Sequence, residues 1–209
     1  MIGDLLTVAS DRRRLTLLAL MAASVSIVAL LLHVAGWLPM HFLINVLAAP
    51  SVALLVTVTV IAHRIDERIV VNRLVTGAWA GLVATLAYDG LRYLLIAAGL
   101  LSYDPFASHP LFGRLITGYP AETVTAIVVG WLYHFWNGVG FGIIYSLIAG
   151  PAHWYYALGW AMFLEVGWLT AMPSLLQFKL SPEFLAVSVS GHAAYGIVLG
   201  LLTQRYVSV

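Results

Sequence analysis

Several residue types that commonly carry chemistry are scarce or absent from this 209-residue chain. It has no cysteine, which excludes disulfide bonds, iron–sulfur clusters, thiolate metal sites and cysteine nucleophiles. Charged residues make up only 9% of the chain, and ten basic residues against nine acidic ones leave no excess positive charge to bind nucleic acid. Lys179 is the only lysine and lies between two apolar runs, so a retinal Schiff base within a helix is excluded. Motifs of nucleotide-binding proteins, serine hydrolases and zincins are also missing.

Apolar residues dominate what remains. They form 62% of the chain, and the mean hydropathy is +0.96. Soluble domains are about 25% charged, so this composition predicts a membrane protein whose partner is the lipid bilayer. The apolar runs are much longer than barrel strands and do not alternate. We therefore expect an all-α, polytopic membrane helix bundle.

Six apolar segments are long enough to cross a bilayer, which requires about 20 helical residues. We expect one integral membrane domain over residues 1–209, with an N-terminal helical hairpin over residues 15–62 and a four-helix bundle over residues 74–203. The six predicted spans are Leu15–Trp37, His41–Ala62, Leu74–Leu101, Thr123–Gly150, Trp154–Phe178 and Phe184–Thr203.

The basic residues are distributed unequally between the two sides of this bundle. Cytoplasmic loops of membrane proteins carry an excess of Lys and Arg. With the N-terminus inside, only Arg114 and Lys179 face outward, and we expect both termini in the cytoplasm. The arginines on the cytoplasmic side are Arg12, Arg13, Arg14, Arg64, Arg68, Arg73 and Arg205.

The connection over residues 102–122 is the only long one, and it contains the apolar run Leu111–Ile116. One interpretation is a short interfacial helix on the outer surface, with Arg114 at the lipid headgroups. The alternative is a lid or re-entrant cap over an opening in the bundle. Interfacial placement is sufficient to explain His109 in this loop.

Ionisable side chains within membrane spans are costly and therefore mark candidate sites. Asp89, His134, Glu165 and His192 lie one on each of the last four predicted spans. The rise per residue places each of them about 12–19 Å from the outer end of its helix. We predict that they converge on one polar cavity, in which Asn137 completes the hydrogen bonding. Such a cluster could relay protons or hold a cation.

Arg92 lies three residues after Asp89, a spacing that puts both on one helix face. A local Asp89–Arg92 ion pair is one interpretation, and recruitment of Asp89 by another helix is its rival. The alternative to a shared site is two separate pairs, with both histidines satisfied locally.

The fourth and sixth predicted spans share the pattern His-xxx-Gly-xxx-Gly, and each follows a span with one buried acid. This suggests a tandem repeat of two hairpins, spans three–four and five–six. Glycines at this spacing let a neighbouring backbone approach, so we expect the two glycine faces to pack against each other. Independent packing faces are the alternative. The glycines are Gly130, Gly138, Gly142, Gly196 and Gly200.

Three functions fit these patterns. The first is transport, or proton or cation handling, through the Asp/His/Glu/His cluster. The second is a redox or metal protein in which His134 and His192 ligate a haem, or in which two histidines and two carboxylates bind a divalent metal such as zinc, iron or manganese. The third is an accessory subunit that packs against other membrane subunits, or against itself. The sequence requires no cofactor and supplies no catalytic residue, which favours a protein that is not an enzyme.

Short motifs occur along the last four spans and the long loop, among them Gly81–Thr85, Tyr133–Phe135 and Gly191–Gly196. They resemble motifs of the YagU-like family of small prokaryotic inner-membrane proteins. The resemblance implies a multi-pass protein of the prokaryotic cytoplasmic membrane, sometimes linked to acid tolerance, and it points to His134 and His192. It covers about two thirds of the chain and supplies no reaction. The matching segments are Gly81–Thr85, Asp104–Phe106, His109–Arg114, Tyr133–Phe135 with Gly138, Gly142 and Tyr145, and Gly191–Gly196 through Gly200.

Overall fold

The chain folds into a bundle of helices in this computed structural model, which describes residues 2–176 and 180–208, with side chains from 11–171 and 180–208. No strand occurs among these residues, so the predicted all-α class is confirmed. The helices are α1 (Ile2–Ala23), α2 (Val25–Val34), α3 (Met40–Arg64), α4 (Arg68–Ala97), α5 (Ser108–Thr117), α6 (Val124–Ala149), α7 (Trp154–Leu176) and α8 (Pro182–Tyr206).

Four of these helices are long and apolar enough to cross a membrane, within the part of the chain that the structure describes: α3, α4, α6 and α8. A bent pair, Asp11–Ala23 with Val25–Val34, would make a fifth span. The end of the predicted span Trp154–Phe178 falls on residues 177 and 178, which lie outside the described residues. The structure therefore supports a membrane bundle with four to five candidate spans.

The first predicted span is bent by 50° near Ser24. The hydroxyl of Ser24 donates a hydrogen bond to the carbonyl oxygen of Leu20, one turn earlier, at 2.7 Å. Serine hydroxyls that bond back to the preceding turn often bend helices. Both segments pack against α3 and α6, and α2 also reaches α7.

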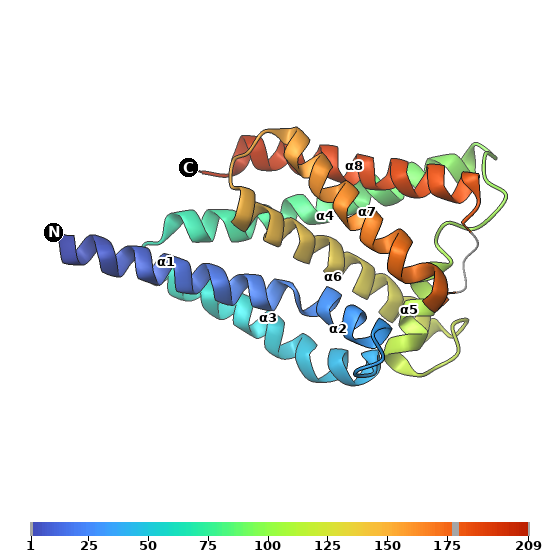
Figure 1. Cartoon of the computed structure of the whole chain (residues 1–209), viewed down its shortest axis with the longest axis horizontal. Coiled ribbons are helices and arrows are strands. Elements are labelled where there is room, and N and C mark those ends of the chain that lie inside the picture. Colours follow the sequence, from blue (N-terminus) through green and yellow to red (C-terminus); the bar gives the residue numbers. More distant parts are fainter. Residues whose placement is uncertain (1, 177–179, 209) are drawn as a thin grey trace.

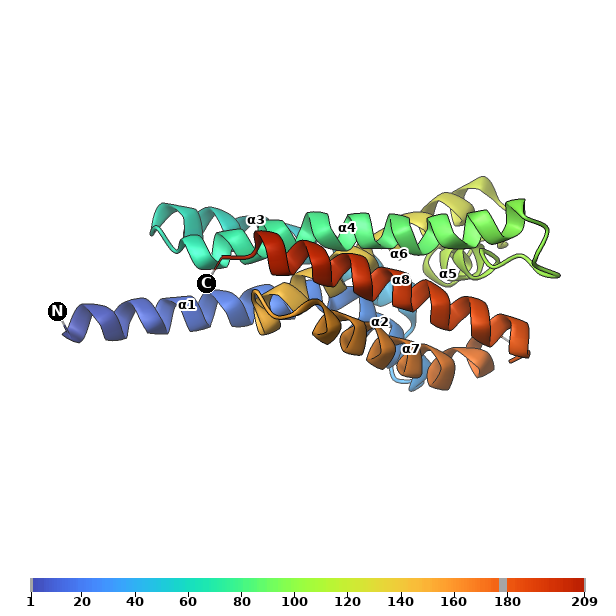
Figure 2. The ribbon, with the colours of Figure 1, turned by 90° about the horizontal axis from the view of Figure 1, so that it is seen from above.

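Helices α4, α6 and α8 lie side by side along the length of the bundle (Figures 1 and 2). Helix α4 packs against both α6 and α8, whereas α7 packs chiefly against α8 and meets α2 and α6 at few points. The two chain termini lie at the same end of the bundle, and α5 lies at the opposite end (Figure 1).

Glycines allow these helices to approach closely, but their partners differ from those expected. A Cβ on Gly142 of α6 would lie 2.6 Å from the Cα of Gly81 on α4. On α8, a Cβ on Gly196 would lie 2.8 Å from the carbonyl oxygen of Ala157 on α7, and Gly200 similarly faces Trp154. The prediction that the glycine faces of the fourth and sixth spans pack against each other is therefore wrong. On α6, Gly138 and Gly142 face α4 and Gly130 faces α5, whereas Gly196 and Gly200 of α8 face α7.

The long connection forms helix α5, which is packed into the bundle. A Cβ on Gly113 would overlap the carbonyl oxygen of Ala126, and one on Gly130 would overlap the carbonyl oxygen of His109, so α5 and α6 touch backbone to backbone. His109 and Phe112 are buried. One face of α5 is therefore covered by the bundle, and Arg114 lies on its exposed side.

Candidate functional site

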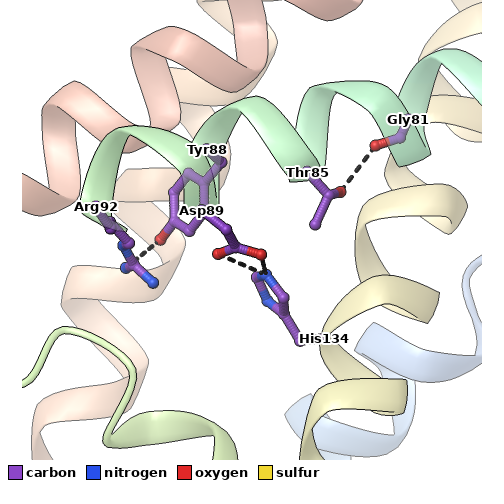
Figure 3. A network of polar contacts seen from close by, with 6 residues as sticks. All are labelled: Gly81, Thr85, Tyr88, Asp89, Arg92 and His134. Carbon is purple, nitrogen blue, oxygen red and sulfur yellow. Dashed lines mark hydrogen bonds and ion pairs between the residues drawn. The ribbon is translucent and has the colours of Figure 1, made fainter. Parts of the chain in front are cut away.

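The carboxylate of Asp89 on α4 is paired with the imidazole of His134 on α6 (Figure 3). Nε2 of His134 lies 2.9 Å from Oδ2 and 3.1 Å from Oδ1 of Asp89. Asp89 is 8% exposed, so its charge depends on this partner rather than on water. The interpretation in which another helix recruits Asp89 is the correct one.

Arg92 makes a different contact from the one that its spacing suggested. Its guanidinium donates a hydrogen bond to the hydroxyl of Tyr88 and lies 4.1 Å from the centre of that ring (Figure 3). The ion pair of Asp89 is with His134, so the local Asp89–Arg92 pair is not formed. Helical spacing puts Arg92 and Asp89 on one face, but the long Arg92 side chain reaches back over Tyr88, one turn earlier.

A second carboxylate–imidazole pair joins α7 to α8. Nδ1 of His192 lies 2.7 Å from Oε2 of Glu165, and the same oxygen accepts a hydrogen bond from the hydroxyl of Ser188 at 3.0 Å. Glu165 is 2% exposed, and its Oε1 has no hydrogen-bond partner among the described residues. Glu165 is therefore a buried acid with one oxygen still able to accept a proton or a ligand.

Tyr88 connects the two pairs. Its ring centre lies 5.9 Å from that of His134 and 5.1 Å from that of His192, so the two imidazoles are at most about 11 Å apart. Gly191 makes room for this ring, because a Cβ there would lie 2.8 Å from Cε2 of Tyr88. The four predicted residues thus form two pairs that meet at one aromatic side chain, and the two pairs share no direct contact.

A cavity of about 270 Å³ borders this centre, between α2, α4, α5, α6, α7 and α8. His134 and His192 both line it, and so do Arg92 and Asn137. Oδ1 of Asn137 is buried without a hydrogen-bond partner among the described residues. Both predicted histidines and the predicted amide therefore face one space, whereas Asp89 and Glu165 stand behind the histidines.

Sequence reasoning missed His109, which α5 inserts beside the first pair. Its ring centre lies 4.3 Å from that of His134 and stacks on Trp131 at 4.2 Å. One ligand atom each from Asp89, His109 and His134 lie within 4.8 Å of one another, a donor set able to hold a metal ion. The signal for burial was the apolar run that follows His109, but sequence alone did not decide which face of α5 is covered.

The buried charges of this centre balance only if one imidazole is protonated or if a cation is bound. Two carboxylates, Asp89 and Glu165, and one guanidinium, Arg92, are all at most 8% exposed. With neutral imidazoles, one negative charge is left in excess. Because a buried net charge is expensive, the centre favours the uptake of one proton or of a cation.

Comparisons with protein-family models, with curated proteins and with solved structures find no match to this chain.

Proposed function

We propose that this is a multi-pass membrane protein that binds and conducts a cation, either a proton or a metal ion, through the centre built by Asp89, His134, Glu165 and His192. The observation that carries the proposal is that two buried carboxylate–imidazole pairs meet at Tyr88 with both histidines on one cavity. Ionisable groups at this depth of a bundle typically mark ion or proton pathways. The uncompensated negative charge of the centre supports a cationic cargo.

The α4–α6 hairpin (the first hairpin) and the α7–α8 hairpin (the second hairpin) have the same internal register, which supports a tandem repeat. In each hairpin, the histidine contacts the acid on the preceding long helix. The glycine four residues after this histidine packs against the residue four positions before the acid. Repeats of this kind are common in transporters, whose sites lie where the repeats meet. The matched positions are Asp89, His134, Gly138 and Thr85 in the first hairpin, and Glu165, His192, Gly196 and Ala161 in the second.

We further propose six membrane crossings with both termini in the cytoplasm. The bent pair α1–α2 and helix α7 would add two crossings to the four long apolar helices. The location of both termini at one end of the bundle supports an even number (Figure 1). The resemblance to the YagU-like family would place the protein in a prokaryotic inner membrane, where a proton-linked role would agree with acid tolerance.

Neither the accessory role nor the haem has a specific observation in its favour. The glycines that would serve an accessory subunit as docking faces are already used between helices of this chain. A haem iron ligated by both histidines would require a ring nitrogen of His134 that faces the iron. In the structure, Nε2 of His134 faces both oxygens of Asp89 instead. We therefore propose neither a docking role nor a haem.

Flux through proteoliposomes tests the proposal. Purified full-length protein is reconstituted around a pH-sensitive dye, with a parallel set around a zinc-sensitive dye, and a gradient of the corresponding cation is imposed. We expect Asp89→Asn and Glu165→Gln each to slow the flux at least about tenfold, because each removes a charge that attracts the cation. His153→Ala, at an exposed histidine outside the cavity, should match the unaltered protein.

Flux no faster than that of empty liposomes for both cations would overturn the proposal. Equal rates in the unaltered protein and in both carboxyl variants would also overturn it, since the pathway would then bypass this centre.

A further inference from the structure

The three donors beside the first pair come from three different helices. Asp89 lies on α4, His134 on α6 and His109 on α5, and one ligand atom of each falls within 4.8 Å of the others. Metal–ligand bonds of about 2.0–2.2 Å require ligand atoms about 3–3.5 Å apart. Side-chain shifts of about 1 Å would therefore close this set around one ion. The His134–Asp89 distances of 2.9 and 3.1 Å are already close to that range.

His109 is unusual because it is a buried polar side chain without a matching partner. It is 2% exposed, and its Nδ1 makes no hydrogen bond to any of the described residues. A neutral imidazole is the form that binds metals. A buried nitrogen without a hydrogen-bond partner is energetically costly and therefore calls for an explanation.

The backbone of the first hairpin is shaped to admit this histidine. Four residues before His134 stands Gly130, and a Cβ there would overlap the carbonyl oxygen of His109. Four residues before His192, at the matching place in the second hairpin, stands Ser188, whose hydroxyl bonds Glu165. The second pair is thus completed by a hydroxyl group of its own helix, and the first by an imidazole brought in by α5.

The donor types define the class of ion. Calcium and magnesium prefer oxygen ligands. Two imidazoles and one carboxylate suit zinc, iron(II) and other first-row divalent ions, and three protein ligands leave a position for water or cargo. His109 and His134 line the cavity, which provides space for that position.

We propose that Asp89, His109 and His134 bind one divalent transition-metal ion. This inference rests on the proposed function to the extent that it names the cation of the same centre. It adds His109 as a ligand and leaves His192 outside the set.

Zinc titration of the purified protein tests the site. Full-length, tag-free protein in detergent is stripped with a chelator and titrated with Zn²⁺ by calorimetry, and with Co²⁺ by absorption spectroscopy. We expect one ion per chain and a Co²⁺ spectrum typical of mixed nitrogen and oxygen ligands. Asp89→Asn and His109→Phe should each weaken Zn²⁺ binding at least about 100-fold, since even outer-shell changes cost 10–100-fold.

His109→Phe is also the control for folding. Phenylalanine retains the stack on Trp131 and removes the unpartnered nitrogen, so the variant should unfold at the same temperature or higher. His153→Ala, at an exposed histidine outside the cavity, is the control and should bind Zn²⁺ within about threefold of the parent.

The inference is wrong if no Zn²⁺ binds, if His109→Phe binds as the parent does, or if His153→Ala loses as much affinity as His109→Phe. Proton flux that persists in the presence of a metal chelator would at the same time leave the proposed function standing.

Discussion

Glycine residues of the bundle differ in what an added methyl group would meet. At Gly142 a Cβ would overlap the carbonyl oxygen of Gly77 across the α4–α6 contact, whereas at Gly90 of α4 it would meet nothing within 4 Å. We predict that Gly142→Ala lowers the free energy of unfolding by about 1–3 kcal/mol, since backbone cannot move aside as a side chain can.

Gly90→Ala should raise the same free energy by about 0.5–1 kcal/mol, because alanine restricts the unfolded chain and favours helix. Thermal unfolding of both variants in detergent is the measurement. If the two proteins melt together, α4 and α6 are not in backbone contact.

The residues of the site were predictable to different extents. Asp89, His134, Glu165 and His192 stood out because ionisable groups are rare inside apolar segments. Their pairing was not predictable, since spacing along one helix favoured Arg92 for Asp89 and gave no information across helices. His109 was missed because it lies in a proline-containing connection, where a histidine needs no special explanation.

At the scale of elements, long apolar runs predicted the helices well. The predicted span Thr123–Gly150 agrees with α6 (Val124–Ala149) to one residue at each end. The bend at Ser24 was not foreseen, because it depends on a side-chain hydrogen bond within an otherwise continuous apolar run. The burial of α5 depends on tertiary packing against α6, which the local sequence does not encode.

The packing of α5 can be tested by chemical labelling, because the chain has no cysteine of its own. Ser108, at the start of α5, is 7% exposed, so the thiol in Ser108→Cys should react slowly with a membrane-impermeant maleimide. Adding Gly113→Ala should speed labelling at least about tenfold, since the overlap with Ala126 costs about 1–3 kcal/mol and 1.4 kcal/mol corresponds to tenfold.

Gly159→Ala on α7, where an added Cβ meets nothing within 4 Å, is the control and should leave the labelling rate unchanged. Fast labelling of Ser108→Cys alone would show that α5 lies on the surface after all.

For the whole molecule, reporter fusions decide the number of crossings. We predict a cytoplasmic signal for fusions after residues 66 and 205, and an external signal for a fusion after residue 120. The physical reason is the excess of arginine at the ends of the helices that we place inside. An external signal after residue 205 would indicate five crossings instead of six. Either α1–α2 or α7 would then not cross the membrane.

The separation of Asp89 and His134 along the chain has a consequence during biosynthesis. Asp89 emerges from the ribosome 45 residues before His134. At a synthesis rate of about 5–20 residues per second, its carboxylate is without this partner for roughly 2–9 s. Arg92 is synthesised directly after it and is the nearest available cation during that interval. We expect Arg92→Gln to reduce the yield of inserted protein more than it reduces the melting temperature of what is purified, and Arg92→Lys to restore that yield. A transient Asp89–Arg92 ion pair, which the folded protein does not contain, would thus help Asp89 to enter the bilayer.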